Sequence, residues 1–233
     1  ITLEDGTTKR INITREHMEE DAGKSTHPSG ADYSLVDLNR AGTPLLEIVS
    51  EPEIHSSAEA KAFAKELWLR MKYAGVSDVD LFHGNMRFDV NVSVSKDHSS
   101  LGTRSETKNL NSFKSVERAV DYEIKRQIEL LENGKKIAQE TRGWLDDKQK
   151  TVSQRSKEDA HDYRYFPDPD IPPILLDDAY IASIEKDIPV MPHQWREKLH
   201  SIGIDHLQTE TLLESQVEYN TDFLSLLADS NDK

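Results

Sequence analysis

The chain has 233 residues, a length that suits one large domain or one domain with an appendage. Hydrophobic residues make up 36% and charged residues 31%, which favours a soluble globular protein and excludes an intrinsically disordered one. There is no cysteine, so disulfides, thiolate zinc sites and cysteine nucleophiles are excluded within these residues. The net charge of −14 argues against a broad nucleic-acid-binding surface, whereas an excess of carboxylates suits a divalent-metal site.

No run approaches the roughly 18 apolar residues that a membrane helix needs, so we expect no contact with a membrane. The first residues carry neither the basic start nor the apolar core of a secretory signal. Together with the lack of cysteine, this is compatible with a cytoplasmic location, which we expect. The chain begins with Ile1 rather than methionine, and we expect it to be an internal piece of a longer protein.

The first third of the sequence predicts strands followed by one helix. Residues 1–15 are typical of a hairpin with a turn at Asp5-Gly6, whereas residues 16–34 are acidic, then glycine-rich, and indicate an ordered loop. The apolar run 45–50 predicts a short buried strand. Apolar residues at helical spacing predict a helix from Ser56 or Ser57 to about residue 74, with a glycine just beyond its end.

The middle of the sequence predicts two neighbouring strands, a long helix and two further strands. Residues 86–94 alternate strictly between apolar and polar, and residues 103–109 alternate too, so residues 95–100 can connect them as a hairpin. Residues 113–132 form a helix between an Asn-Ser cap and an Asn-Gly end. Residues 137–156 indicate two strands around an Asp-Asp turn.

The end of the sequence changes character near residue 175, where we place a domain boundary. Residues 163–173 contain four prolines, which force extended backbone. Beyond the boundary, four short amphipathic helices are predicted, over residues 178–187, 192–202, 206–215 and 217–229.

An acidic segment, residues 15–27, is the first candidate for chemistry. Its closely spaced carboxylates repel one another unless a cation or a proton separates them, and Mg²⁺ is commonly held by one or two carboxylates plus phosphate oxygens. Gly23-Lys24-Ser25 offers backbone N–H groups and a cation to a phosphate. The segment is not a P-loop, because position 18 is methionine where that motif requires glycine. The alternative is a solvated acidic loop.

The two neighbouring strands supply the second candidate. If they pair, their polar faces form a floor of mixed charge on which carboxylates can bind metal and cations can bind phosphate. The alternative is a solvent-facing sheet with cross-strand ion pairs. The residues in question are Arg87, Asp89, Asn91, Arg104, Glu106 and Lys108.

Residues 139–142 and 162–167 form the third candidate. Arg164, between Tyr163 and Tyr165, can stack on a base or contact a phosphate, and the alternative is a proline-stiffened strap whose aromatic side chains close the core. The spacing of the histidines does not indicate a dedicated metal site, and no Ser-His-Asp arrangement is readable. These histidines include His17, His27, His83 and His161.

Five segments, taken in order, closely resemble the B subunit of the bacterial aspartyl/glutamyl-tRNA amidotransferases. They are residues 17–24, 33–45, 108–113, 139–142 and 162–167. The resemblance implies an α+β fold with a mostly antiparallel sheet cradle related to glutamine synthetase, followed by a small all-helical segment. It implies a catalytic domain over residues 1–175 and the start of a helical domain over residues 176–233.

The resemblance also implies a function. The family phosphorylates the side-chain carboxylate of Glu-tRNA(Gln) or Asp-tRNA(Asn) with ATP and Mg²⁺. Ammonia, which the amidase partner releases from glutamine, then displaces the phosphate, and a third, small partner holds the other two together in a heterotrimer. The metal carboxylates of the family match Glu20 and Glu106, whereas Asp89 and Lys24 match polar positions on the phosphate or ammonia route.

Other interpretations stay open. One is an assembly or tRNA-binding subunit without chemistry of its own, and another is a glutamine synthetase-like ligase that acts on a free metabolite. The archaeal-type relative carries an inserted domain, for which there is no room before residue 175, so the bacterial type is favoured. Because family segments that supply further metal ligands and tRNA contacts are missing, we expect this piece to be inactive alone.

Overall fold

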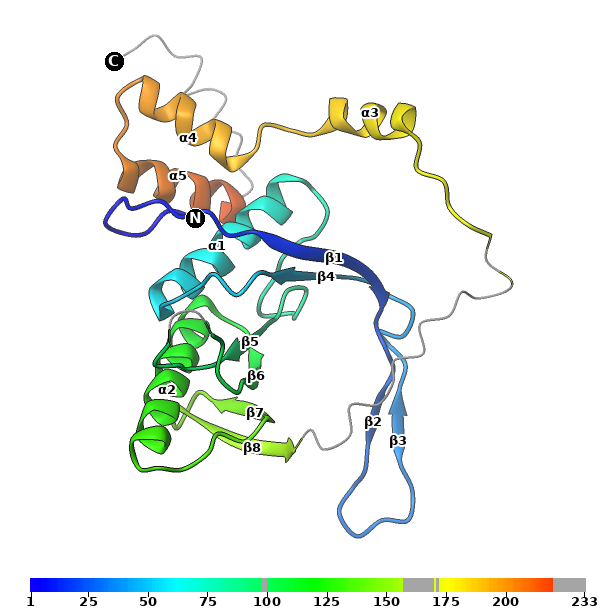
Figure 1. Ribbon diagram of the computed structural model, residues 1–233. Helices are drawn as coiled ribbons and strands as arrows, with labels where there is room; N and C mark the ends of the chain where they lie inside the picture. Colours follow the sequence, from blue (N-terminus) through cyan, green and yellow to red (C-terminus); the bar gives the residue numbers. More distant parts are fainter. Residues whose placement is uncertain (98–99, 157–169, 171, 220–233) are drawn as a thin grey trace. The chain divides into compact units, whose positions relative to one another are not determined.

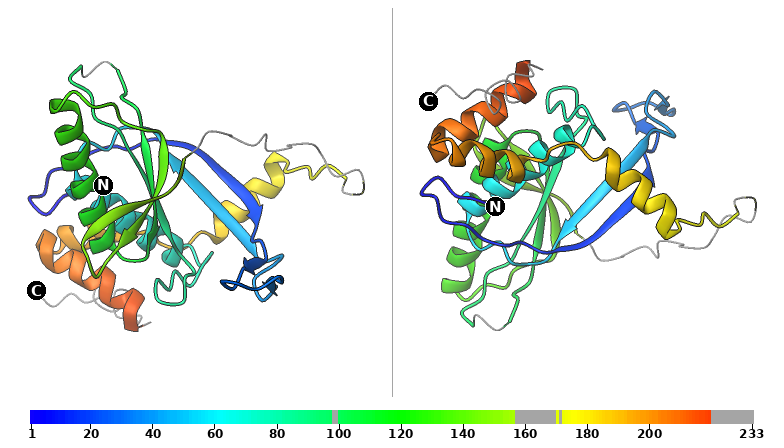
Figure 2. Two further views of the ribbon diagram at one scale, coloured as in Figure 1. Left: turned by 90° about the horizontal axis from the view of Figure 1, so that it is seen from below. Right: turned by 90° about the horizontal axis from the view of Figure 1, so that it is seen from above.

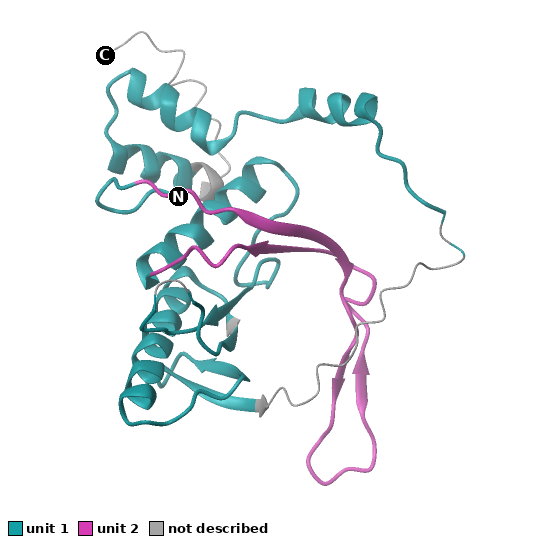
Figure 3. Ribbon diagram, viewed as in Figure 1, with its two compact units in different colours: residues 1–7, 56–233 teal, residues 8–55 magenta. Residues whose placement is uncertain are grey.

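The computed structural model describes residues 1–97, 100–156, 170 and 172–219. The chain divides into two compact units, shown in Figure 3. Unit 1 combines residues 1–7 with residues 56–233, and unit 2 consists of residues 8–55. Unit 2 is therefore an excursion of the chain out of unit 1. The domain boundary predicted near residue 175 stays a prediction.

Unit 2 consists of two antiparallel strand pairs. Strand β1 (Ile13–Glu20) pairs with β4 (Pro44–Ser50), and β2 (Lys24–Thr26) pairs with β3 (Leu35–Asp37), as Figure 1 shows. At the base of the first pair the Asn12 side chain and backbone donate hydrogen bonds to the Glu53 carboxylate at 2.8 and 2.7 Å. These contacts close a neck through which the chain enters and leaves the unit.

The strand β1 corrects the prediction of a loop over residues 16–34. Most residues of β1 are exposed in this unit, so neither face of the strand carries the apolar repeat that marks a half-buried strand. The strand expected over residues 45–50 is present as β4, but it is half-buried or exposed rather than buried. The predicted turn is confirmed: the Gly6 N–H donates to the Leu3 carbonyl oxygen, and Gly6 has a φ of +83°.

Helix α1 (Ser57–Tyr73) begins and ends as the sequence predicts. The Ser56 hydroxyl accepts a hydrogen bond from the Glu59 N–H at 3.1 Å, which satisfies one of the free donors of the first turn. Gly75 follows the helix with a φ of +71°, a conformation that costs glycine little. Three residues of α1 are buried: Ala60, Ala64 and Leu69.

A four-stranded sheet carries helix α2 (Phe113–Glu132) against one face (Figures 1 and 2). Its strands lie in the order β5 (Phe88–Val92), β6 (Ser105–Leu110), β7 (Glu140–Leu145) and β8 (Lys150–Ser156). The β5–β6 and β7–β8 pairs are antiparallel, as expected, but β6 and β7 are parallel. Helix α2 is the crossover that a parallel pair requires.

The alternation of the first two strands is confirmed. Val92 on β5 and Ser105 and Thr107 on β6 are buried on the side of α2, whereas Asp89 and Asn91 are exposed on the open face. Both strands are shorter than the predicted ranges. The prediction of an α+β fold with a mostly antiparallel sheet is therefore confirmed for the described residues.

A buried carboxylate joins α2 to the sheet. Glu123 is fully buried and accepts hydrogen bonds from the Ser105 hydroxyl at 2.7 Å, from the Thr151 hydroxyl and from the Arg126 guanidinium at 2.8 to 3.0 Å. The Arg142 Nε lies 3.1 Å from the same carboxylate. Burial by itself raises the pKa of Glu123, but these hydrogen bonds and the Arg126 charge outweigh it, so the pKa is lowered.

Three further helices are described in the C-terminal part of the chain, and the first of them has no buried residue. Helices α3 (Asp178–Asp187), α4 (Pro192–Ser201) and α5 (His206–Tyr219) lie close to the predicted ranges, although α5 runs past residue 215. Most of the helix expected over residues 217–229 falls outside the described residues. None of the described helices is long and apolar enough to span a bilayer.

Helices α4 and α5 pack on α1 through an apolar cluster and one half-buried cation. The cluster consists of Leu69, Trp195, Leu199 and Leu213. Beside it, the Arg196 guanidinium donates to Glu66 on α1 at 2.8 Å and to Glu210 on α5 at 2.6 and 3.0 Å. Helices α4 and α5 therefore belong to the same core as α1.

We predict that Glu123→Gln lowers the free energy of unfolding by about 3 kcal/mol, because Arg126 and Arg142 lose a buried partner charge. Glu129→Gln, on an exposed position of the same helix, is the matched control and should change it by less than about 0.5 kcal/mol. The measurement is denaturant unfolding of the two variants side by side. Equal stabilities would contradict the structural role given to Glu123.

Glu66 makes the fold sensitive to acid. Burial by itself raises the pKa of Glu66, but the hydrogen bonds and charges of Arg196 and Arg70 outweigh it, and the pKa is lowered. A carboxyl with a lowered pKa stabilises the folded state above its unfolded-state pKa of about 4.3, and that stabilisation is lost as the pH falls through the folded-state value.

The melting temperature should therefore decrease from about pH 5 downward, and it should do so less steeply in Glu66→Gln. Thermal unfolding followed between about pH 5 and pH 3 tests this. Glu185→Gln, on an exposed position of α3, is the control and should keep the wild-type slope. Identical slopes in all three proteins would rule the Glu66 contribution out.

Candidate functional site

Polar side chains from three strands share the open face of the four-stranded sheet, opposite α2. We call them the polar floor: Asp89, Asn91, Glu106, Lys108 and Thr141. Asn91 of β5 lies opposite Glu106 of β6, and Glu106 lies beside Thr141 of β7 in the parallel register. The sequence predicted the first four members from alternation alone.

A single cation lies between the two carboxylates of the floor. The Lys108 Nζ is 3.0 Å from Asp89 Oδ2 and 3.5 Å from Glu106 Oε1. The Thr141 hydroxyl donates to Glu106 Oε2 at 3.1 Å. Burial by itself lowers the pKa of Lys108, but the hydrogen bond and charge of Asp89 and the charge of Glu106 outweigh it, so the pKa is raised.

The members of the floor differ in how far they reach the solvent. The side chains of Asp89 and Lys108 are 46% and 39% exposed, whereas that of Glu106 is only 16% exposed. Carboxylate oxygens are the ligands that Mg²⁺ prefers, and an ammonium group binds phosphate oxygens. The floor therefore offers both partners that a metal-bound phosphate requires, with the Glu106 carboxylate recessed and the cation accessible.

Arg87 and Arg104 lie just outside the two strands that carry most of the floor. Each is exposed and stands one residue before its strand begins, Arg87 before β5 and Arg104 before β6. Because the two strands are antiparallel, the two arginines lie at opposite ends of the pair. Both strands are shorter than the alternation suggests, and the expectation that these two arginines share one surface with the floor stays a prediction.

The acidic segment lies in unit 2, where the strands divide its carboxylates between two faces. Glu20 is the last residue of β1, opposite Pro44, and Lys24 is the first residue of β2, opposite Asp37. Both side chains are exposed within the unit. Since Glu20 belongs to unit 2 and Glu106 to unit 1, their convergence on one metal ion stays a prediction.

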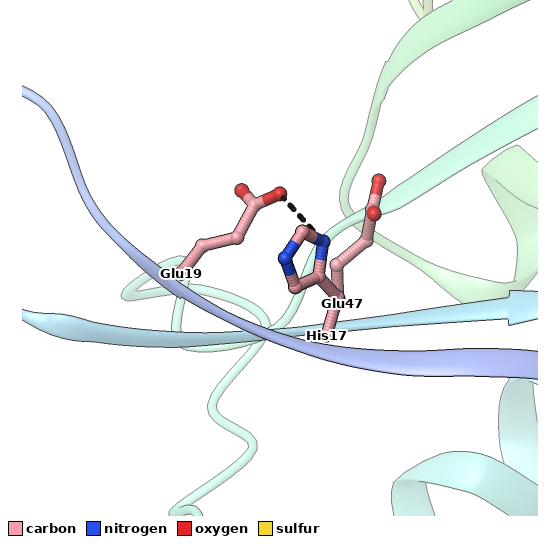
Figure 4. Close-up of side chains that lie close together, drawn as sticks. All are labelled: His17, Glu19 and Glu47. Carbon is pink, nitrogen blue, oxygen red and sulfur yellow. Dashed lines mark ion pairs between the residues drawn. The ribbon is translucent and has the colours of Figure 1, made fainter. Parts of the chain in front are cut away.

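One group of side chains in the described residues has the composition of a metal site. His17 and Glu19 of β1 and Glu47 of β4 point toward one another, and each offers a ligand atom within 4.8 Å of the others, as Figure 4 shows. Sequence spacing could not indicate it, because Glu47 comes from another strand. Arg15 already pairs with Glu47 at 3.0 Å, and exposed groups of this kind are common without an ion, so we assign no metal here.

The third candidate segment is mostly structural where it is described. Arg142 is buried, donates to the Thr151 hydroxyl at 2.7 Å and pairs with Glu140. Residues 162–167, including Arg164, lie outside the described residues. The sequence included Thr141 in this third segment but did not place it beside Glu106, which follows from the parallel pairing of β7 with β6.

Comparison with known proteins gives consistent matches. A model of the GatB/GatE catalytic domain matches residues 1–182. The B subunit of the aspartyl/glutamyl-tRNA(Asn/Gln) amidotransferase of Pseudomonas aeruginosa (strain LESB58) is 52% identical over 202 residues, covering 86% of this chain and 42% of the relative. The protein of the same name from Caldicellulosiruptor saccharolyticus is 54% identical over 194 residues, covering 83% of this chain and 40% of the relative.

A third relative extends the match to the C-terminal helices. The protein of that name from Pseudomonas putida (strain F1) is 45% identical over 234 residues, covering 99% of this chain and 49% of the relative. The chain thus spans less than half the length of these relatives. The family match includes the acidic segment and the whole polar floor, and it confirms the resemblance found in the sequence. The chain belongs to the GatB/GatE catalytic domain family.

Proposed function

We propose that this chain is the part of a tRNA amidotransferase B subunit that activates the misacylated amino acid. In the proposed reaction, the side-chain carboxylate of Glu-tRNA(Gln) or Asp-tRNA(Asn) is phosphorylated by ATP, and ammonia then displaces the phosphate to leave the amide. The complete amidotransferase complex is then a ligase that forms a carbon–nitrogen bond, with glutamine as the donor of the amide nitrogen. The observation that carries the proposal is the polar floor, in which Lys108 lies between two carboxylates inside a matched family domain.

The side chains of the floor fit a magnesium ion by their chemistry. Glu106 and Asp89 offer carboxylate oxygens, and one or two such groups are enough for Mg²⁺ when phosphate oxygens complete its shell. In the proposal, Glu106 holds the ion together with Glu20 from the acidic segment. When bound, Mg²⁺ neutralises charge on the transferred phosphoryl group.

The cation of the floor is suited to hold a phosphate in place. The raised pKa of Lys108 keeps its ammonium group charged at neutral pH, and its partner Asp89 fixes the direction of that group. Positioning and charge stabilisation supply most of the catalysis in phosphoryl transfer. We assign Lys108 to a phosphate oxygen and Asp89 to orienting it.

The remaining candidate residues complete the proposal with polar contacts. Lys24 and Arg87 offer cations to phosphate oxygens, as Arg104 does at the other end of the β5–β6 pair, and Asn91 offers an amide to the nucleotide or the substrate. The cradle formed by these strands is proposed to be related to glutamine synthetase, which performs a comparable activation of a carboxylate.

The partners follow from the same proposal. An amidase partner supplies ammonia, a small third partner joins the two into a heterotrimer, and the substrate is a misacylated tRNA. A net charge of −14 leaves little basic surface for RNA on this chain, so most tRNA contacts are expected on other parts of the assembly.

We predict that Glu106→Gln in the full-length protein, assembled in its complex, lowers ATP-dependent amidation of the tRNA at least about 100-fold, because a metal ligand is lost. Glutamine hydrolysis by the complex should persist, which shows that assembly is intact. Glu132→Gln, at an exposed position of α2, is the matched control and should keep full activity.

Two other outcomes would redirect the assignment. Wild-type amidation in both Glu106→Gln and Glu20→Gln would favour an assembly or tRNA-binding subunit over a catalytic one. Amidation of free glutamate without tRNA would instead favour a ligase that makes a free metabolite.

For Lys108 we predict that Lys108→Met lowers kcat for amidation about 100-fold, equivalent to about 3 kcal/mol of transition-state stabilisation. The physical reason is the loss of the accessible cation beside the transferred phosphate. Lys125→Met is the control, because Lys125 pairs locally with Asp121 on the exposed side of α2. Steady-state kinetics of both variants with ATP as the varied substrate test the prediction, and matching kcat values would refute it.

A further inference from the structure

Thr141 stands out among the polar residues that the proposed reaction does not yet use. The residue is only 1% exposed, although its side chain contacts Glu106 on the open face of the sheet. Its hydroxyl donates a hydrogen bond to Glu106 Oε2 at 3.1 Å. A buried hydroxyl needs a partner, and this one is satisfied by the carboxylate to which the proposed function gives the metal.

We propose that Thr141 is the positioning residue that fixes the Glu106 carboxylate for metal binding. The inference rests on the proposed function, because it takes Glu106 as a ligand of Mg²⁺. Groups that form a hydrogen bond with a metal-binding side chain fix its orientation, and their loss commonly weakens metal binding about 10- to 100-fold.

The position of Thr141 is set from the opposite face of the sheet. Arg142 contacts Glu123 of α2, whereas Thr141 contacts Glu106 on the floor, and the pairing of β7 with β8 shifts register between these two residues. Arg142 is held by the Thr151 hydroxyl at 2.7 Å and lies 3.1 Å from the buried carboxylate of Glu123. These contacts tie β7 to β8 and to α2, and the parallel pairing of β7 with β6 then sets Thr141 beside Glu106.

The hydrogen bond also determines which oxygen of the Glu106 carboxylate contacts which neighbour. Oε2 accepts from Thr141, and Oε1 lies 3.5 Å from the Lys108 ammonium group. Each carboxylate oxygen has two lone pairs, so both keep acceptor capacity for an ion. Without the hydroxyl, the carboxylate can rotate toward Lys108, where a direct ion pair competes with the metal.

A β-branched residue suits this role better than a flexible one. Threonine has few χ1 rotamers, so its hydroxyl has a fixed direction when the methyl group is packed. Valine has nearly the same shape without the donor, and serine keeps the donor without the methyl group. Thr141→Val and Thr141→Ser therefore separate the hydrogen bond from the packing.

The chain provides a close control for the first of these substitutions. Thr107 is fully buried on the same strand as Glu106, one residue away and on the opposite face. Its hydroxyl has no hydrogen-bond partner among the described residues. Thr107→Val therefore removes a buried hydroxyl next to the site without removing a contact to Glu106.

The experiment measures Mn²⁺, as a paramagnetic substitute for Mg²⁺, bound to the full-length protein in its complex by electron paramagnetic resonance in the presence of a non-hydrolysable ATP analogue. Thr141→Val should raise the Kd for Mn²⁺ about 10-fold or more, and Thr141→Ser should recover it to within about 3-fold of wild type. Thr107→Val should bind as wild type does. The Mg²⁺ concentration that half-saturates amidation should shift in the same order.

The inclusion of Glu106→Gln in the series separates this inference from the proposed function. If Glu106→Gln weakens Mn²⁺ binding and Thr141→Val does not, the positioning role of Thr141 is wrong while the function stands. If neither variant changes the Kd, Glu106 is not a ligand and both fall. Equal losses in Thr141→Val and Thr107→Val would also overturn the inference, since a general effect of buried hydroxyl loss would then explain the result.

Discussion

The buried carboxylate of Glu123 is the constraint on which the described sheet depends. A carboxylate in an apolar interior is costly unless charged donors surround it, and here Arg126, Arg142 and two hydroxyl groups do so. Because the donors come from β6, β7, β8 and α2 itself, one group fixes how the helix crosses three strands. The strands that carry the polar floor on the opposite face are positioned by this packing of α2 on the sheet.

The open face of the sheet also carries paired charges, but there they are partly exposed to the solvent. Beneath the sheet, charges are enclosed and matched by near neighbours, so they contribute to the stability of one conformation. On the floor, Lys108 is shared between Asp89 and Glu106 and remains accessible, so an added anion or cation can exchange with these partners. Similar residue types therefore stabilise the fold on one face and, in the proposed function, bind a ligand on the other.

The sequence predicted the local parts of this fold, and long-range pairing limited the rest. Caps and apolar spacing were sufficient for α1 and α2, and strict alternation placed Asp89 and Glu106 on one face of paired strands. The parallel pairing of β6 with β7 depends on the packing of α2, which no local pattern encodes, so the sequence placed Thr141 in a separate candidate segment rather than beside Glu106. Strand β1 was taken for a loop because its polarity does not alternate in a unit with so little buried surface.

The neck formed by Asn12 and Glu53 has a consequence for how the chain tolerates change. The chain leaves unit 1 after Thr7 and returns at Ser56, and the hydrogen bonds of the neck bring the outgoing and returning strands together. Paired ribbons of two strands contribute little core of their own. Insertions or deletions at the tip between β2 and β3, beyond Glu20 and Lys24, can therefore change the length of this excursion while the connectivity of the remaining domain is preserved.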